Sequence, residues 1–376
     1  TLFRSIDDDS AVANVFNAFF KDKISNLHER IPVKHCQNPL QHLNGRVSNN
    51  DNLGFELRTM SEKHVLKIMK TLPGKKSCGY DGISSSLLKS CAEILYLPLS
   101  RIINTSLLTG QFPEKWKLAI VRPLHKKGST SEKKNYRPVS LLNTSSMVLE
   151  KVVKIQIEMY SESQDLLGKN QYGFRSNRST TTAITALHSR LLHNLNKGLY
   201  NALALYDLSA AFDCLDKDIL CGKLIKYGFQ GKSIEWLQSY LSNRKQKVLI
   251  NCTYSSELLL PCGAPQGSCL SPMLFILLIS DIEDWAQESE LYGYCDDTSH
   301  ICEAVTLEGA IGKLEREAGK ILSFMSSNKL VINPAKTCII LHSPKDKSTS
   351  HSVKIGEDLI MTSQKGTLLE IGRAHV

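Results

Sequence analysis

Three aspartates stand where carboxylates are able to act together. Asp207 directly follows the apolar run of residues 202–206, and Asp296 and Asp297 follow residues 291–295, which read as one arm of a hairpin. Strand ends and hairpin tips are often neighbours in one sheet, so we expect these side chains to crowd together. Like charges about 4 Å apart repel by about 4 kcal/mol at an effective dielectric of 20, and such a cluster therefore takes up protons or binds cations.

Magnesium is the cation that this carboxylate pattern favours. Its preferred ligands are hard oxygens, and it keeps open positions for water and phosphate oxygens. Two such ions about 3.5–4 Å apart activate an attacking hydroxyl and stabilise a leaving phosphate, which is the chemistry of nucleotidyl transfer. A plainer interpretation stays open for each motif alone, in which Asp207 caps the following helix and Asp296 and Asp297 form an ordinary turn.

The positions of these aspartates depend on strands that the hydrophobic pattern predicts in the second half of the chain. Residues 202–206 read as a strand, and residues 247–261 and 291–302 read as two hairpins. Helical periodicity runs through residues 271–288 and 307–325. Antiparallel strands with helices packed on one face indicate an α+β unit.

The first half of the chain reads as helical. Apolar residues recur at helical spacing within residues 12–27, a second helix opens at Ser61, and a helical pattern dominates residues 84–195. The polar stretch 35–52 reads as a linker. A basic segment at residues 125–137 interrupts the helical pattern.

Composition excludes several classes of protein. The 376 residues carry 46 Lys plus Arg against 37 Asp plus Glu, a net charge of +9, which permits a polyanionic partner without requiring one. The 11 cysteines include no C-x-x-C pair, which argues against a disulfide framework or a thiolate zinc site, so no disulfide partner is expected. The longest apolar run, residues 273–279, falls far short of the ~18 residues of a membrane span, so no membrane partner is expected.

Three segments carry a resemblance to a known family: 206–213 (YDLSAAFD), 263–272 (GAPQGSCLSP) and 294–297 (YCDD). In order and spacing they are similar to the first three palm motifs of reverse transcriptases from jockey-type non-LTR retrotransposons. The resemblance covers about residues 10–369. The other matching segments are 79–83 (GYDGI), 116–117 (WK), 123–128 (PLHKKG), 135–142 (NYRPVSLL), 171–175 (QYGFR) and 328–337 (NKLVINPAKT), the last of which looks like the fourth palm motif.

The resemblance implies a right-hand polymerase fold of the α+β class, with helical fingers and a palm built on an antiparallel sheet. It places an N-terminal helix and linker at residues 1–58, the fingers at 59–200 and the palm at 201–369, with a fingers-side insertion at about 215–260. Residues 370–376 read as a non-native tail, and the thumb is expected to be missing.

The resemblance also implies which residues carry the chemistry. Asp207 and Asp296 are expected to hold two Mg²⁺ ions, with Asp297 beside them as a weaker partner and Mn²⁺ as a substitute metal. Lys336 matches a lysine proposed to protonate the leaving pyrophosphate, and an exposed strand-end lysine is the plainer interpretation. Cys295 stands where relatives usually have Ala, a departure that removes no metal ligand.

The nucleotide-binding residues implied by the resemblance are Lys126, Arg137, Leu208, Phe212, Gln266 and Gly267. Lys126 and Arg137 match basic fingers residues that grip the triphosphate, and Phe212 matches an aromatic gate against a ribose 2′-hydroxyl. Gln266 and Gly267 match a motif that contacts the incoming nucleotide and the template, where glycine lets the backbone approach a ligand closely. The plainer interpretations are a solvated basic loop, a core aromatic and a turn before a buried helix.

The function expected from this resemblance is RNA-directed DNA polymerase, a nucleotidyltransferase that extends a DNA primer on an RNA template with dNTPs. The alternatives are a non-catalytic, maturase-like RNA-binding scaffold and an inactive transposon remnant. The three intact aspartates argue against the scaffold, and the unbroken motifs argue against the remnant. In the family the primer is a nicked chromosomal end, so an intracellular, nuclear location is expected for the parent protein.

Overall fold

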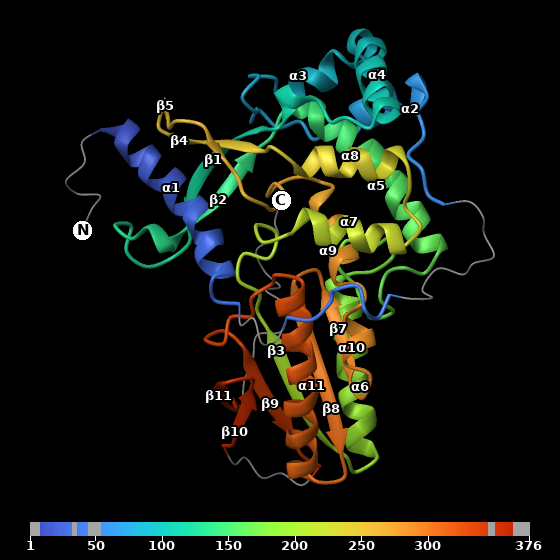
Figure 1. Ribbon diagram of the computed structural model, residues 1–376, viewed down its shortest axis with the longest axis vertical. Helices are drawn as coiled ribbons and strands as arrows, with labels where there is room; N and C mark the ends of the chain where they lie inside the picture. The colour runs from blue at the N-terminus through green and yellow to red at the C-terminus, as the bar shows by residue number, and fades with distance from the viewer. Residues whose placement is uncertain (1–7, 32–35, 44–53, 345–349, 364–376) are drawn as a thin grey trace. The chain divides into compact units, whose positions relative to one another are not determined.

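The computed structural model describes residues 8–31, 36–43, 54–344 and 350–363 (Figure 1). The chain divides into unit 1 (Thr1–Glu29, Gly45–Gln164, Phe212–Leu274) and unit 2 (Arg30–Asn44, Asp165–Ala211, Phe275–Val376). The expected tail at residues 370–376 and most of the expected linker at 35–52 lie outside the described residues.

Unit 1 contains a five-stranded sheet. Its strands are β1 (Leu118–His125), β2 (Tyr136–Leu141), β4 (Lys245–Ile250), β5 (Thr253–Tyr254) and β6 (Leu258–Leu259). β1 pairs antiparallel with β2 and parallel with β4, and β4 pairs antiparallel with β5 and β6. The hairpin predicted at residues 247–261 is confirmed, whereas the helical prediction was wrong where β1 and β2 lie.

The error at β1 has a physical reason. Its apolar run covers only residues 118–121, and so short a run does not separate a buried strand from a buried helical turn. β1 is held as a strand by a distant partner, since Leu118 pairs with Lys245 and Val121 with Val248. Local pattern carries no information about that pairing.

One helix of unit 1, α1 (Asp9–His28), packs on this sheet, and the others pack mainly on one another. The other helices are α2 (Glu62–Lys70), α3 (Ser85–Ser90), α4 (Ala92–Thr109), α5 (Thr144–Ser163), α7 (Lys217–Lys226) and α8 (Lys232–Leu241), with 3₁₀ turns at Glu114–Trp116 and Lys133–Asn135. From α1, Ala13, Phe16 and Phe20 pack against Val121 and Val248 of the sheet. Residues at this 3–4 spacing share one helix face, so α1 lies on the sheet as an amphipathic cover.

Unit 2 is built on a four-stranded antiparallel sheet in the order β7-β8-β3-β9. Its strands are β3 (Tyr200–Tyr206), β7 (Glu290–Tyr294), β8 (Asp297–Ala304) and β9 (Cys338–His342), and a separate hairpin joins β10 (Ser352–Ile355) to β11 (Asp358–Met361). The helices are α6 (Thr180–Asn196), α10 (Ile282–Trp285) and α11 (Leu307–Ser327), and the division between the units falls within α9 (Ser271–Ile279). The predicted strand 202–206 and the hairpin at 291–302 are confirmed.

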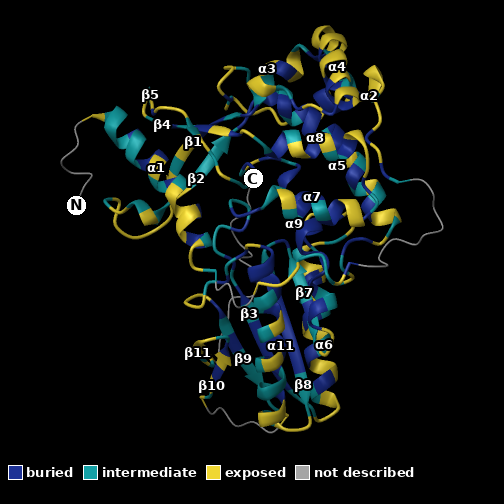
Figure 2. Ribbon diagram, viewed as in Figure 1, coloured by how far each residue is buried: buried dark blue, intermediate teal, exposed yellow. Residues whose placement is uncertain are grey.

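Helices cover both faces of the unit 2 sheet, and the expectation of one covered face was wrong. Leu187 of α6 packs with Leu203 and Ile301. The next residue of β8, Cys302, lies within electrostatic range of Lys313 on α11. Because successive strand residues point to opposite faces, α6 and α11 lie on opposite sides. Figure 2 shows β3 and β8 as the buried centre of the sheet, which explains the unbroken apolar run of β3.

The predicted helix 271–288 is interrupted. α9 ends at Ile279 and α10 begins at Ile282. At the break, the Ser280 hydroxyl donates to the carbonyl of Leu277 at 3.1 Å, a local side-chain bond of the kind that competes with helix continuation. The helix predicted at 307–325 is confirmed as α11, and the coarse α+β class is confirmed by both sheets. Among the helices described, none is both long and apolar enough to cross a membrane.

A buried histidine in β8 links the sheet's stability to pH. His300 Nδ1 lies 3.1 Å from the hydroxyl of Tyr206, and His300 Nε2 lies 3.5 Å from the thiol of Cys302. Burial lowers the pKa of His300 from its usual 6.5 to about 3. The folded state therefore keeps the ring neutral, while the unfolded chain binds a proton below pH 6.5.

We expect the His300 contribution to unit 2 stability to be complete above pH 6.5 and to be lost as the pH falls from 6.5 towards 3. The loss is up to about 1.4 kcal/mol per pH unit within that window. The measurement compares urea unfolding of the wild type and His300→Gln at pH 7, 5 and 4. A difference in unfolding free energy between the two proteins that does not change with pH would contradict the assignment.

Candidate functional site

The strand order of unit 2 places Asp207 between two other predicted site residues. Asp207 follows the last residue of β3, Tyr206, which pairs with Thr298 of β8. On the other side of β3, Leu205 pairs with Cys338 of β9. The two antiparallel pairings therefore bring the start of β8 and the segment before β9 level with Asp207.

Lys336 contacts Asp207 directly. Its Nζ lies 3.1 Å from Oδ1 and 3.0 Å from Oδ2 of Asp207. Backbone bonds hold the two segments together, because the N–H of Asn333 donates to the Asp207 carbonyl at 2.8 Å and the N–H of Ser209 donates to Val331 at 2.8 Å. The structure thus joins Lys336 to the first aspartate across 129 residues of sequence.

Asp207 does not cap the following helix. The next helix along the chain, α7, begins at Lys217, and its cap is Asp216, whose carboxylate accepts the N–H groups of Asp218 and Ile219. This removes the plainer interpretation of Asp207. Leu208, predicted to line the nucleotide site, is buried, and its backbone pairs with Ile332.

Asp296 lies in the turn between β7 and β8. Tyr294 pairs with Asp297, so the two turn residues are Cys295 and Asp296, and Asp297 is the first residue of β8. The hairpin tip is therefore one residue earlier than the sequence indicated. Cys295 has φ +60°, a left-handed conformation that costs a non-glycine residue roughly 1–2 kcal/mol.

A segment outside the hairpin holds this turn in place. Gln171 Oε1 accepts the N–H of Cys295 at 3.0 Å and the N–H of Gly173 at 2.9 Å. The N–H of Tyr172 donates to the Gly293 carbonyl at 2.7 Å. A Cβ on Gly173 would lie 2.3 Å from the Cys295 nitrogen, so only glycine permits this approach. Residues 171–175 match a family motif, but no local sequence pattern predicts that they hold this turn.

Burial and neighbouring charges shift the pKa of the Asp296 carboxyl. Burial raises the pKa of its carboxyl above the usual value, and the Asp207 charge raises it further. The Lys336 ammonium acts in the opposite direction and lowers it. Two coupled carboxylates with a cation bound to one of them form a site suited to positive charge.

The donor set fits a hard metal ion that shares its ligands with a substrate. Within the described part of the chain, no group of three or more His, Cys, Asp and Glu side chains is placed to hold a metal ion. The Lys336 ammonium on both oxygens of Asp207 shows that this carboxylate accepts a cation. Carboxylate oxygens that leave positions for phosphate oxygens are what Mg²⁺ prefers. The participation of Asp297 stays a prediction.

Unit 1 carries the other predicted residues. Lys126 follows β1, and its N–H donates to the Asn135 carbonyl at 2.8 Å. Arg137 lies on β2 opposite Leu124, and the Lys126 and Arg137 residues are both exposed. The carbonyl of Phe212 accepts the N–H of Ala264 at 2.9 Å.

Gly267 forms a tight turn beside β2. It has φ +102°, and a Cβ there would lie 2.9 Å from the Ser140 carbonyl. The neighbouring Ser268 is fixed from inside, because its hydroxyl donates to the buried Glu150 at 2.6 Å and lies 2.9 Å from the Tyr240 hydroxyl. Burial raises the pKa of Glu150. The exposed backbone at Gly267 is therefore held in one conformation by the buried hydrogen bonds of Ser268.

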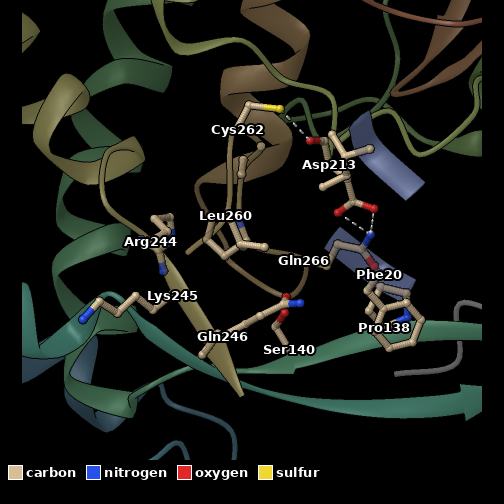
Figure 3. Close-up of a pocket in the computed structure, with 15 residues that line it drawn as sticks. Phe20, Pro138, Ser140, Asp213, Arg244, Lys245, Gln246, Leu260, Cys262 and Gln266 are labelled. Carbon is tan, nitrogen blue, oxygen red and sulfur yellow. Dashed lines mark hydrogen bonds between the residues drawn. The ribbon is translucent and has the colours of Figure 1, made fainter. Parts of the chain in front are cut away.

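Gln266 lines a small cavity of about 40 Å³ in unit 1 (Figure 3). Its amide faces the carboxylate of Asp213, and Pro138 and Ser140 of β2 line the same cavity. A space of this size has room for a few water molecules. Gln266 and the adjacent Gly267 therefore both lie beside β2.

We expect Gln171→Ala to destabilise unit 2 by about 1–3 kcal/mol, because the buried N–H of Cys295 loses its acceptor. Urea unfolding monitored on the whole chain measures this change. Gln287→Ala is the matched control, since that exposed side chain only donates to the Asp284 carbonyl. Equal stabilities of the two variants would show that the bond to Cys295 does not hold the turn.

Comparison with known proteins assigns the family. The model of the family described as reverse transcriptase (RNA-dependent DNA polymerase) matches residues 124–357, more than half of the chain. A probable RNA-directed DNA polymerase from transposon BS of Drosophila melanogaster is 27% identical over 293 residues, which are 76% of this chain and 32% of the relative. The RNA-directed DNA polymerase from the mobile element jockey of the same species is 25% identical over 292 residues, again 76% and 32%.

A third relative, the probable RNA-directed DNA polymerase from transposon X-element of D. melanogaster, is 29% identical over 230 residues, 61% of this chain and 25% of the relative. The chain thus spans at most about a third of the length of these relatives. The resemblance inferred from the sequence motifs is confirmed, and the chain belongs to the reverse transcriptase family, among its jockey-like, non-LTR members.

Proposed function

We propose that this chain carries RNA-directed DNA polymerase activity, extending a DNA primer 3′-hydroxyl on an RNA template with dNTPs. The observation that supports it best is the placement of Asp207 and Asp296 at adjacent strand ends with Lys336 on Asp207. Family membership supports the same reaction. Because the chain spans only part of its relatives, the activity and the nucleic-acid partners are proposals for this chain.

In this proposal, Asp207 and Asp296 hold Mg²⁺, with Mn²⁺ as a substitute and Asp297 as a weaker partner. When bound, two such ions activate the attacking hydroxyl and stabilise the leaving phosphate. Lys336 lies beside the carboxylates with a proton to give, which suits protonation of the leaving pyrophosphate. Gln171 and Gly173 contact the turn that carries Asp296 and hold its backbone in place.

Unit 1 is proposed as the fingers and unit 2 as the palm of a right-hand polymerase. Lys126 and Arg137 bind the triphosphate, a role supported by their exposure and charge. Phe212 is the proposed gate that selects deoxynucleotides, and Leu208 is a proposed nucleotide-binding residue. Gln266 and Gly267 contact the nucleotide and the template. The segment boundaries expected from the sequence stay predictions.

The proposed template is RNA, and its backbone contacts are salt-dependent, since basic side chains release counterions from phosphates. The parent protein is proposed to act in the nucleus, where a nicked chromosomal end supplies the primer. A maturase-like scaffold and an inactive remnant remain the competing functions, and neither requires metal-dependent nucleotide incorporation. Primer extension with Mg²⁺ therefore separates them from a polymerase.

We expect the chain to extend a DNA primer on a homopolymeric RNA template with Mg²⁺, and Asp296→Asn to reduce the rate by about 100-fold or more, because a metal ligand is lost. Gel analysis of primer extension measures both proteins. Asp358→Asn, an exposed carboxylate in β11, is the control and should extend like the wild type. Extension that survives Asp296→Asn would refute the residue assignment, and no extension by the wild type would favour the scaffold or the remnant.

We expect Lys336→Met to tighten Mn²⁺ binding in the absence of nucleic acid by about two- to fivefold, because the metal no longer competes with a partly exposed ion pair. Electron paramagnetic resonance titration with Mn²⁺ measures the affinity directly. Lys354→Met removes an exposed lysine of β10 and should leave the affinity unchanged. Weaker Mn²⁺ binding by Lys336→Met would mean that Lys336 does not occupy a cation position.

A further inference from the structure

Asp213 and Gln266 form a hydrogen-bonded pair in unit 1 (Figure 3). A single nitrogen of the Gln266 amide, Nε2, lies 2.8 Å from both carboxylate oxygens of Asp213. Asp213 is the last residue of the 206–213 motif, and Gln266 lies in the 263–272 motif. The pair therefore joins two of the sequence motifs across 53 residues.

The backbone around the pair is tightly held. The N–H of Gly263 donates to Leu215 at 2.9 Å, and the N–H of Ala264 donates to Phe212 at 2.9 Å. Gly263 has φ +97°, and a Cβ there would lie 2.6 Å from the Asp213 carbonyl. The two side chains meet because their backbones run side by side, so the bond is part of the local fold and not a chance surface contact.

The chemistry of this pair determines which way the amide points. An ionised carboxylate only accepts hydrogen bonds, so the NH₂ group of Gln266 must face Asp213 and the carbonyl oxygen Oε1 must face away. Burial raises the pKa of the Asp213 carboxyl above its usual value, while the hydrogen bond from Gln266 and the Lys23 ammonium lower it. The Gln266 nitrogen lies on both carboxylate oxygens, which is the arrangement that an ionised carboxylate accepts. Over the residues that the structure describes, Oε1 accepts no hydrogen bond. The half-buried Gln266 thus presents an unused acceptor.

The Gln266 Oε1 atom can bind only a substrate group that donates a hydrogen bond. A polymerase must use all four bases, so a contact to a base amino group would favour some templates over others. A sugar hydroxyl is present whatever the base is. Gly267 follows directly and is exposed, so a sugar and phosphate can approach the chain beside Gln266.

We propose that Asp213 is a positioning residue, which orients the Gln266 amide so that Oε1 accepts a hydrogen bond from a substrate sugar hydroxyl. The hydroxyl is either the 2′-OH of the templating ribonucleotide or the 3′-OH of the incoming dNTP. This inference rests on the proposed function and specifies how its substrate is recognised. In Asp213→Asn, the side-chain amide both donates and accepts, so Gln266 loses its single orientation.

The test measures single-nucleotide incorporation with fluorine in place of each hydroxyl, since fluorine keeps the sugar shape but donates no hydrogen bond. One arm uses a 2′-fluoro templating nucleotide, and the other uses a 3′-fluoro dNTP. We expect the wild type to prefer the hydroxyl over fluorine in one arm by about 5- to 30-fold in kcat/KM, the value of one hydrogen bond. The arm that shows the preference identifies the sugar.

Variants of Asp213 and Gln266 test whether this pair causes the preference for the hydroxyl over fluorine. Asp213→Asn should reduce it to about twofold or less. Asp218→Asn, an exposed carboxylate of α7, should retain the wild-type preference. Gln266→Met keeps the side-chain length without the acceptor and should abolish the preference, which keeps the inference testable if thermal melting shows that Asp213→Asn is unfolded.

Three results would overturn the inference: no hydroxyl preference in either arm for the wild type, an undiminished preference in folded Asp213→Asn, or a preference that persists in Gln266→Met. Each of these still leaves the proposed function in place, because primer extension is observed. If the unmodified chain extends no primer, the proposed function fails and this inference fails with it.

Discussion

The antiparallel pairing of β3 with β8 on one side and β9 on the other is the constraint on which the candidate site depends. β3 ends at Tyr206, and only this register brings Asp207 level with the β7–β8 turn and with the segment before β9. A slip of one residue would turn every side chain of β3 to the other face of the sheet. Burial of both faces, by α6 and by α11, makes such a slip costly.

The site is held in unfavourable local conformations by contacts around it. Cys295, Ala210 and Lys329 all have positive φ values, close to Asp296, Asp207 and the segment before Lys336 respectively. Each costs roughly 1–3 kcal/mol and persists only where neighbours determine it. For Cys295 the neighbours are Gln171 and Gly173, which clamp the turn.

In unit 1, a buried hydrogen-bond network supports the turn at Gly267. The buried Glu150 accepts from Ser268, and Tyr240 contacts the same hydroxyl, so a polar network stands under the Gly267 turn. Tyr240 in turn stacks on Trp236 with ring centroids 5.4 Å apart. A buried network of this kind tolerates few alternatives, because an unpaired member costs free energy. The exposed turn at Gly267 is therefore held in one conformation by the buried network beneath it.

The sequence alone determined which residue types carry the chemistry and in which elements they lie. The apolar run before Asp207, the hairpin around Asp296 and the helix at 307–325 are local patterns, and each is confirmed because burial selects apolar residues at a spacing that a single strand or helix reveals. The family motifs were identified by their resemblance to the palm motifs of reverse transcriptases.

The tertiary structure alone decided how these elements meet. The parallel pairing of β1 with β4, the covering of both sheet faces, the clamp of Gln171 on Cys295 and the contact of Lys336 with Asp207 all join residues far apart in the chain. Asp213 and Gln266 are likewise 53 residues apart, and no periodicity predicts that one orients the other. Such pairings depend on which strands find each other, and that is a property of the whole fold.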